Sequence, residues 1–336
     1  LSPQSLLLLS RASRGIRELV SEYFKTAFDI NATLGRFLPD PMSFRCLQAR
    51  TGTLVSGSVA LQFFDRTRYE TSDLDIYVYL PFRREVGRWL LSQGFEFTPS
   101  RHQEESFEAA VLPRRQSKGF HYAMPGVAAI YTFHRHTLRA SIKVQIIVAI
   151  RMPMEVILGF HSTCVMNAIS YEKAYCLYPR ATLEDRCSLL SWSSQGRAKR
   201  RAEGIQKYSA RGFRMLTLPD WDVHTPNRSF PSITRWFGDC HAWTISLSLN
   251  GITPPPPYNV YTTPRLHDPA ALTSFLMRWD PVDGAIMSFR VVKVPILRFY
   301  FVASDVAAVN YLTSLLLQKD EEDVHTVADC SIDDWK

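Results

Sequence analysis

Two carboxylates at the head of a strand-like run, downstream of a Gly-Ser turn, constrain the fold of this chain more than any other feature. The stretch at 53–80 reads TLVSGSVALQFFDRTRYETSDLDIYVYL. A short apolar run enters Gly57 and Ser58, and fourteen residues separate this turn from Asp73. Side chains at positions i and i+2 of a strand point to the same face. We therefore expect Asp73 and Asp75 to lie side by side on one face of a sheet.

These carboxylates, taken with the turn before them, predict a site for a triphosphate and a divalent metal. Paired carboxylates can share one or two ions such as Mg²⁺, which prefers hard oxygen ligands and retains water and substrate phosphates. A Gly-Ser turn that feeds a helix offers backbone N–H groups to a phosphate, and the missing side chain permits close approach. We expect Gly57 and Ser58 to hold the phosphates, and Asp73 and Asp75 to hold Mg²⁺ or Mn²⁺. In the alternative, Asp73 caps a turn and Asp75 is a solvated edge residue.

The order of these motifs resembles the nucleotidyltransferase superfamily of the DNA polymerase beta type. In that family an apolar residue precedes Gly-Gly or Gly-Ser, and an acidic-apolar-acidic triplet follows after a spacer. Gly57 and Ser58 match the turn, Asp73 and Asp75 match the acids, and the spacer is slightly long; the resemblance covers roughly residues 30–165. It implies that a nucleoside triphosphate binds with Mg²⁺ and that its nucleotidyl group passes to a hydroxyl while pyrophosphate leaves. The acceptor would be RNA or another hydroxyl-bearing molecule.

The family places a third carboxylate on a later strand beside the first, and here an amide takes the fitting position. The stretch SIKVQIIVA at 141–149 alternates as a strand, with Gln145 at its centre. An amide oxygen binds metal weakly and cannot act as a base toward the acceptor hydroxyl. The catalytic positions implied by the resemblance are Asp73, Asp75 and Gln145. Three possibilities stay open: Glu155 or another acid completes the site, the protein binds nucleotide without turning it over, or the strand register differs.

A very basic segment follows the predicted core. The sequence RAKRRAEGIQKYSARGFR at 197–214 reads as part of a helix over 182–214. Lys199 and Lys207 are candidates for contact with nucleotide phosphates or a nucleic-acid backbone. Lys207 shares a helical face with Arg211, because residues four apart are neighbours on a helix. A solvated basic helix explains the same residues without a ligand.

Three further candidates each have an ordinary structural explanation. His134 and His136 straddle a hairpin turn and could bind a metal, but no third ligand at fitting spacing is evident. His161 and Cys164 offer nucleophilic chemistry, although their apolar setting favours a packed thiol. Base stacking is the third, and its candidates are Trp236, Trp243 and Trp279. Core packing is the commoner role of such aromatic side chains.

Hydrophobic periodicity predicts an α/β (α+β) protein whose nucleotidyltransferase-like core is a short mixed sheet with flanking helices. We divide the chain into an N-terminal helical segment at 1–29, the core at 30–180, and a C-terminal mixed helical and strand region with the basic helix at 181–336. Helices are expected at 14–38, 59–64, 83–93, 153–160, 182–214 and 304–318. Strands are expected at 54–55, 73–80, 127–135 and 138–149 and within 286–302, with loops at 98–118 and 254–257.

Composition places few limits on function. The chain has 336 residues, of which 46% are apolar, and this is ample for a large core. A net charge of +7 favours contact with polyanions, although an ordinary basic enzyme surface explains it equally well. No apolar run reaches the ~18 residues that a membrane span needs. The six cysteines lack C-x-x-C spacing, so we expect free and mostly buried thiols in a soluble, intracellular protein of the cytoplasm or nucleus.

The sequence therefore leaves three functions open. The first is Mg²⁺-dependent nucleotidyl transfer from a nucleoside triphosphate. The second is a catalytically inactive member of the same fold that serves as a binding or scaffold module, and Gln145 in the third acidic position motivates it. In the third, the chain has no nucleotide role and the motifs are coincidental. Convergence of Asp73, Asp75 and a third acidic side chain, in place of Gln145, on one site would favour nucleotidyl transfer.

Overall fold

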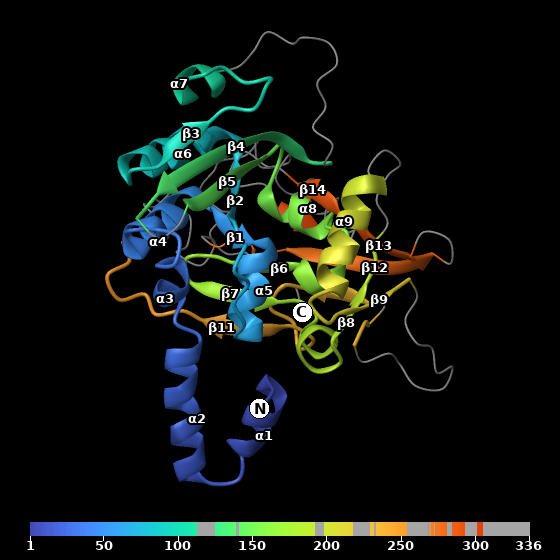
Figure 1. Cartoon of the computed structure of the whole chain (residues 1–336). Helices are drawn as coiled ribbons and strands as arrows, with labels where there is room; N and C mark the ends of the chain where they lie inside the picture. The colour runs from blue at the N-terminus through green and yellow to red at the C-terminus, as the bar shows by residue number, and fades with distance from the viewer. Residues whose placement is uncertain are drawn as a thin grey trace, which may run out of the picture.

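The computed structural model shown in Figure 1 describes most of the chain, and the structural statements below concern these residues. The described residues are 1–112, 125–138, 141–191, 198–217, 229–231, 233–253, 268, 270–271, 273–280, 284–292 and 301–304. Within them the chain is a mixed α/β protein.

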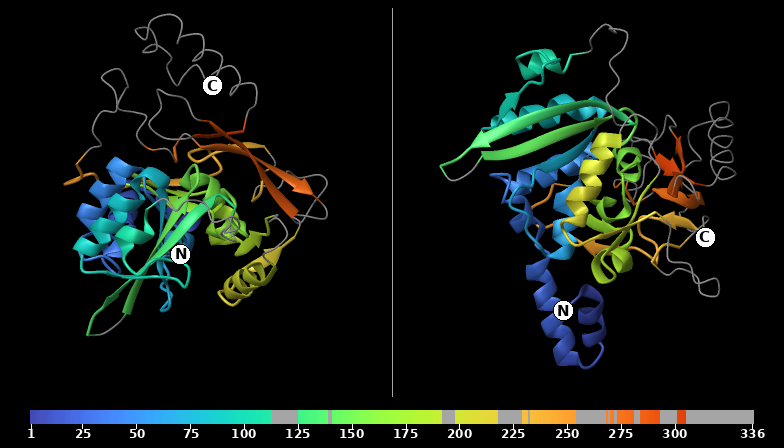
Figure 2. Two further views of the ribbon diagram at one scale, coloured as in Figure 1. Left: turned by 90° about the horizontal axis from the view of Figure 1, so that it is seen from above. Right: turned by 45° about the vertical axis from the view of Figure 1, so that its right-hand side comes forward.

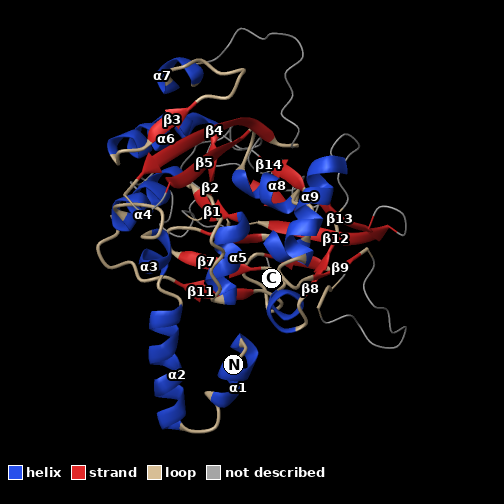
Figure 3. Cartoon of the chain, in the orientation of Figure 1, coloured by secondary structure: helices blue, strands red, loops and turns tan. Residues whose placement is uncertain are grey.

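Four helices open the chain, helices and strands then alternate as far as β4, and short strands dominate the second half (Figure 3). The helices are α1 (Pro3–Leu9), α2 (Arg14–Ala27), α3 (Ile30–Leu34), α4 (Pro41–Thr51), α5 (Gly57–Asp65), α6 (Arg83–Ser92), α7 (Phe107–Ala110), α8 (Pro153–Leu158) and α9 (Ala198–Ser209), with short helical turns at Leu80–Phe82, Thr163–Val165 and Arg180–Glu184. The strands are β1 (Leu54–Ser56), β2 (Leu74–Tyr79), β3 (Glu96–Thr98), β4 (Val127–His136), β5 (Ser141–Ala149), β6 (Asn167–Ile169), β7 (Lys173–Cys176), β8 (Cys187–Leu189), β9 (Arg214–Leu216), β10 (Thr234–Trp236), β11 (Trp243–Ser246), β12 (Ser274–Asp280), β13 (Gly284–Ser288), β14 (Arg290–Val292) and β15 (Phe301–Ala303).

An eight-stranded mixed sheet in the order β11-β7-β6-β1-β2-β5-β4-β3 runs through the molecule. Strands β2 and β5 are parallel, and every other neighbouring pair in this sheet is antiparallel. The sheet has more strands than the short one expected, because β3, β6, β7 and β11 were not predicted; of these, β11 comes from the 181–336 region and pairs with β7 at the edge. Smaller sheets are formed by β10, β12 and β13, by β14 and β15, and by β8 and β9.

Side chains of the two central strands alternate between two buried clusters, one on each face of the sheet. The first cluster contains Leu74, Ile76 and Val78 of β2 and Val144, Ile146 and Val148 of β5, with side chains from α4 and α6. The second contains Tyr77 and Tyr79 of β2 and Ile147 and Ala149 of β5, with side chains from α8 and α9. Because strand side chains have a period of two, Asp75 and Gln145 fall on the second face. The alternation of 141–149 predicts that Val144 and Ile146 lie on the opposite face from Ile147, and this is confirmed.

The helix expected at 14–38 is instead two helices, since an aspartate begins a new one. Helix α2 ends at Ala27, and the Asp29 carboxylate accepts hydrogen bonds from the backbone N–H groups of Asn31 and Ala32 at 2.8 and 3.1 Å. An aspartate in this position satisfies N–H groups that have no partner inside the helix. The chain therefore turns at Asp29 before α3 begins.

The helix expected over 182–214 is wrong over most of its length. Among the described residues of this range, α9 is the one α-helix, and it is preceded by β8 and followed by β9. Cys187 pairs in parallel with Arg214, so the chain leaves a small sheet, forms the basic helix and returns. The high density of basic residues therefore indicates a helix only over α9, although basic residues continue to Arg214 in β9. The predicted loop at 98–118 contains α7, whereas 254–257 and most of the predicted helix at 304–318 lie outside the described residues.

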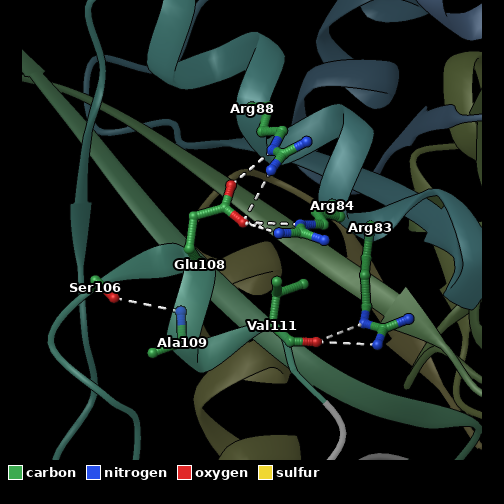
Figure 4. A network of polar contacts seen from close by, with 7 residues as sticks. All are labelled: Arg83, Arg84, Arg88, Ser106, Glu108, Ala109 and Val111. Carbon is green, nitrogen blue, oxygen red and sulfur yellow. Dashed lines mark hydrogen bonds and ion pairs between the residues drawn. The ribbon is translucent and has the colours of Figure 1, made fainter.

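Two peripheral features frame the body of the protein. Helices α1 and α2 form a hairpin that projects away from the sheet (Figures 1 and 2). At the opposite end, α7 is fastened to α6 by a polar network (Figure 4). Glu108 on α7 accepts hydrogen bonds from Arg84 and Arg88 of α6, at 2.7 and 2.6 Å from their Nε atoms. The ring of Phe107 packs directly over Gly87 of α6.

The described residues also bear on the expectations about membranes and thiols. Within them, no helix is long and apolar enough to cross a membrane. Five of the six cysteines lie in this part of the chain and all five are free thiols, as predicted. Cys164, Cys176 and Cys187 are buried, whereas Cys240 is exposed. Cys330 lies outside the described residues.

Candidate functional site

The Gly-Ser turn meets the second carboxylate directly. Strand β1 ends at Ser56, whose backbone pairs with Asp75 of β2, and α5 begins at the next residue. Gly57 has φ = 66°, a conformation that residues with a side chain rarely adopt. A Cβ atom built on Gly57 would lie 3.0 Å from Asp75 Oδ2. The glycine is therefore required twice, by its backbone conformation and by the carboxylate beside it.

The first turn of α5 keeps N–H groups without a side-chain cap. The Ser56 hydroxyl, which stands in the N-cap position, donates instead to the backbone carbonyl of Asn167 on β6. Ser58 is buried, with 6% of its surface exposed, and its hydroxyl makes no hydrogen bond to any described residue. The start of a helix carries partial positive charge and attracts anions. This end of α5 lies beside the Asp75 carboxylate, so the two features expected from the sequence do converge.

The two carboxylates of β2 have different surroundings. Asp73 is half-exposed, and its Oδ2 lies 2.6 Å from Nζ of Lys143 on β5. The side-chain carboxylate of Asp75 receives no hydrogen bond from the described residues. Burial, followed by the charge of Asp73, raises the pKa of Asp75 to about 7, although Lys207 and Lys143 act in the opposite direction. Asp75 is thus a carboxylate whose negative charge is incompletely compensated.

Gln145 lies beside the second carboxylate. In the parallel pairing of β2 with β5, the residue opposite Asp75 is Gln145. Its Nε2 atom donates to the Thr132 hydroxyl on β4 at 3.3 Å. The register therefore brings an amide, and not a third carboxylate, beside Asp75. Glu155, the nearest acid along the chain, is on α8 beyond the end of β5, where its carboxylate pairs with Arg151.

The basic helix contributes one lysine to this site. Lys207 is in the last turn of α9, and its interaction with Asp75 and Asp73 favours the charged ammonium. Partial burial, followed by the charge of Arg211, nevertheless lowers the pKa of Lys207. Lys199 lies eight residues earlier on the same helix, about 12 Å along its axis. Among the described side chains of α9, Lys207 is the predicted phosphate ligand that interacts with the carboxylates.

Aromatic contacts hold the end of α9 against the segment before β2. The Arg211 guanidinium lies 3.6 Å from the ring centroid of Tyr69 and 5.1 Å from that of Tyr208. The backbone N–H of Tyr69 donates to Gln62 of α5 at 2.8 Å. Cation–π contacts of this kind stabilise partly buried arginines. Arg211 therefore has a positioning role, which the sequence-based pairing with Lys207 did not predict.

The donor set fits a divalent metal poorly. Asp73 and Asp75 bring two negative charges, Lys143 and Lys207 bring two positive charges, and Gln145 is neutral. Mg²⁺ sites in proteins are built from oxygen ligands with surplus negative charge. Among the described residues, no group of three or more acidic, histidine or cysteine side chains could hold an ion. An ammonium group already lies against the carboxylate that the metal would need.

The weaker sequence candidates have structural explanations. His134 and His136 are stacked on β4 with ring centroids 6.3 Å apart, and His134 Nδ1 lies 2.8 Å from the Thr98 hydroxyl. The His161 ring packs on Tyr208, and burial raises the pKa of the Cys164 thiol, so this pair is ill-suited to nucleophilic chemistry. The tryptophans differ: Trp243 packs among Phe24, Phe28 and Phe64, Trp236 is 39% exposed, and the side chain of Trp279 is outside the described part.

Lys143 is the site residue that sequence reasoning missed. The alternation of 141–149 placed it on the same face as Gln145, two residues away, and that was the available signal. Its partner Asp73 lies 70 residues earlier in the chain, and only the β2–β5 pairing brings the two together. Comparisons of this chain with family models, with curated proteins and with solved structures find no significant match.

Proposed function

We propose that this chain is a nucleotide-binding protein with a nucleotidyltransferase-like site, which holds a nucleoside triphosphate and transfers its nucleotidyl group very slowly or not at all. The observation that carries the proposal is the pairing of Asp75 with Gln145. It sets an amide beside Asp75, so the site lacks a third carboxylate that would help position a metal and activate the acceptor hydroxyl.

Binding is supported by the groups that surround the β2 carboxylates. The first turn of α5 offers N–H groups beside Gly57, and the Ser58 hydroxyl is available to a phosphate oxygen. Lys207 supplies a positive charge from α9. Backbone N–H groups and a lysine are the usual partners of nucleotide phosphates. In this arrangement Gly57 and Ser58 hold the terminal phosphates and Lys207 neutralises them.

The second candidate function is Mg²⁺- or Mn²⁺-dependent nucleotidyl transfer to RNA or to another hydroxyl-bearing acceptor. Asp73, the residue before β2, and Asp75 within it favour it, because residues two apart along a strand share a face, as the family pattern requires. It requires that the Lys143–Asp73 ion pair open and that an acid outside this pair replace Gln145.

The test is a thermal-shift screen with each of the four nucleoside triphosphates, followed by an assay of pyrophosphate release. A ligand at about 100 times its dissociation constant should stabilise the fold by about 2.7 kcal/mol, which raises the melting temperature by several degrees. We expect such a rise for at least one nucleotide, with no pyrophosphate release above background. Rapid release would instead establish the transferase, and Glu155→Gln would then be expected to abolish it while Gln145→Ala is tolerated.

A further inference from the structure

We propose that Lys143 is a built-in cation of this site, so that the triphosphate binds without a divalent metal. The inference rests on the proposed function, since it concerns how the same site neutralises a bound phosphate. It assigns to a side chain of β5 the part that Mg²⁺ plays in the proteins that this chain resembles.

The position of Lys143 is the first argument. Its ammonium lies 2.6 Å from Asp73 Oδ2, so it makes a charge-assisted hydrogen bond with the first carboxylate of the pair. About a third of each side chain is exposed, 35% for Lys143 and 37% for Asp73. The ammonium is therefore held by the sheet and is still open to a ligand from solution. Lys143 is two positions before Gln145, which is the neighbour of Asp75.

The balance of charge is the second argument. Lys143 and Lys207 together carry the two positive charges that one Mg²⁺ would bring to the two β2 carboxylates. A metal bound by both aspartates would have to displace the Lys143 ammonium from Asp73, and it would find an amide where a third anionic ligand is needed. A triphosphate brings anionic oxygens, which lysine binds as a compact point charge with three donors. The site thus offers two ammonium groups to a phosphate and lacks the surplus negative charge that a metal needs.

The surroundings of Lys143 contain one further titratable group on the neighbouring strand. His134 of β4 is its cross-strand partner, and the His134 ring is engaged with the Thr98 hydroxyl. No other acidic side chain among the described residues forms an ion pair with Lys143. The ammonium is therefore shared between Asp73 and whatever anion enters the site.

The inference is tested by isothermal titration of the full chain with ATP, in excess EDTA and again in excess MgCl₂. We expect the wild-type dissociation constant to differ by less than about threefold between the two conditions. Lys143→Met should weaken binding in EDTA by about tenfold or more, which corresponds to the ~1.5–3 kcal/mol of a hydrogen bond to a charged group. Lys143→Arg keeps the positive charge and should retain most of the EDTA-condition affinity.

A matched control comes from β7, near the opposite edge of the sheet from β5. Lys173 of β7 also lies near a carboxylate, that of Glu172 at 3.8 Å, and it is 40% exposed. Lys173→Met removes a comparable lysine far from the site in the strand order, so ATP binding should be unchanged in both conditions. Circular dichroism and melting temperature verify that each variant is folded, and Lys143→Arg preserves the test if Lys143→Met is not.

The outcomes separate this inference from the proposed function. The role of Lys143 as a built-in cation is overturned if wild-type protein binds ATP only with Mg²⁺, or if Lys143→Met binds ATP in EDTA as tightly as wild type. Either result leaves nucleotide binding established. Absence of ATP binding in every condition overturns both. Binding in EDTA that is lost in Lys143→Met and kept in Lys143→Arg and Lys173→Met supports the inference.

Discussion

Glu108 and Asp75 are both carboxylates with cationic side chains nearby, and their surroundings differ in an instructive way. Both oxygens of Glu108 accept hydrogen bonds from guanidinium groups, and Arg88, followed by Arg84, holds the pKa of Glu108 below its usual range (Figure 4). Asp75 has no such donor among the described residues, and burial raises its pKa. A carboxylate whose oxygens accept hydrogen bonds holds one element against another, whereas a buried carboxylate without such donors costs the fold stability in its charged form.

The same two regions each contain a glycine that permits a close approach. At Gly57 the neighbour is the Asp75 carboxylate, with 3.0 Å between Oδ2 and an added Cβ atom. At Gly87 the neighbour is the Phe107 ring, whose nearest atom would be 2.0 Å from the added carbon. The first contact is polar and lies at the proposed site, and the second is apolar and holds α7 on α6. Substitution at each position should separate binding from stability.

The largest effect is expected from Gly57→Ala. An alanine with positive φ costs roughly 1–2 kcal/mol, and the new methyl group would crowd the Asp75 carboxylate as well. We expect a lower melting temperature, together with ATP binding weakened by about tenfold or more. Chemical denaturation measures the first quantity and isothermal titration the second.

Gly94 provides a matched control for this substitution. It also has positive φ, 78°, but an added Cβ atom would meet nothing within 4 Å. Gly94→Ala should therefore show the conformational cost alone, roughly 1–2 kcal/mol, with ATP binding intact. Equal effects of the two substitutions on stability and on binding would mean that the contact between Gly57 and Asp75 has no special role.

The next largest effect is expected from Gly87→Ala on α6. The added methyl group would overlap the Phe107 ring, so α7 must shift, and overpacking of this kind costs about 1–3 kcal/mol. ATP binding should be retained, because the change is confined to the α6–α7 contact. Gly15→Ala on α2, where an added carbon meets nothing within 4 Å, is the control and should be neutral or stabilising. Loss of ATP binding in folded Gly87→Ala would place α7 in the site.

The contrast between these regions also explains what could be predicted from the sequence. The order of a short strand, a Gly-Ser turn and an acidic pair correctly predicted that β1, α5 and β2 exist, because period-two alternation and glycine chemistry are local properties. Helix α5 nevertheless begins at Gly57, two residues before the predicted helix. The alternation of 141–149 predicted the faces of its side chains, whereas only the resemblance pointed to Gln145 as the neighbour of the acids; the β2–β5 register pairs it with Asp75. Lys143 was missed because its role depends on a charge 70 residues away.

Elements of the C-terminal region were harder to predict for a related reason. Strands β8 and β9 have three residues each, too few for periodicity to show, and the dense basic charge of α9 extended the predicted helix over β9. Strand β11 joins the main sheet only through its pairing with β7, from Trp243 opposite Cys176 onward. Non-local pairing of short segments leaves little trace in a single sequence.

A smaller effect with a diagnostic sign is expected from Asp75→Asn. The folded-state pKa of Asp75 is raised to about 7, so between the unfolded pKa near 4 and pH 7 the folded state binds more protons than the unfolded state. Wild-type stability should therefore fall as the pH rises through this range. Asparagine removes the penalty, and the variant should gain on the order of 2 kcal/mol at pH 8 and nothing below pH 4. Denaturation at several pH values measures the difference, and a variant less stable than wild type at pH 8 would contradict it.

The smallest effect, of opposite sign, is expected from Glu108→Gln. The pKa of Glu108 is lowered by hydrogen bonds from Arg88 and Arg84, so its charge stabilises the fold above the unfolded pKa, and this contribution is lost as the pH falls through the lower, folded-state value. The pair is exposed, and exposed ion pairs contribute little and are screened by salt. Glu108→Gln should lower the melting temperature slightly at neutral pH and low salt, with the loss shrinking in high salt. A gain in stability at neutral pH would show that the ion pairs of Glu108 do not stabilise the fold. The contrast between the carboxylates of Glu108 and Asp75 would then be contradicted at Glu108.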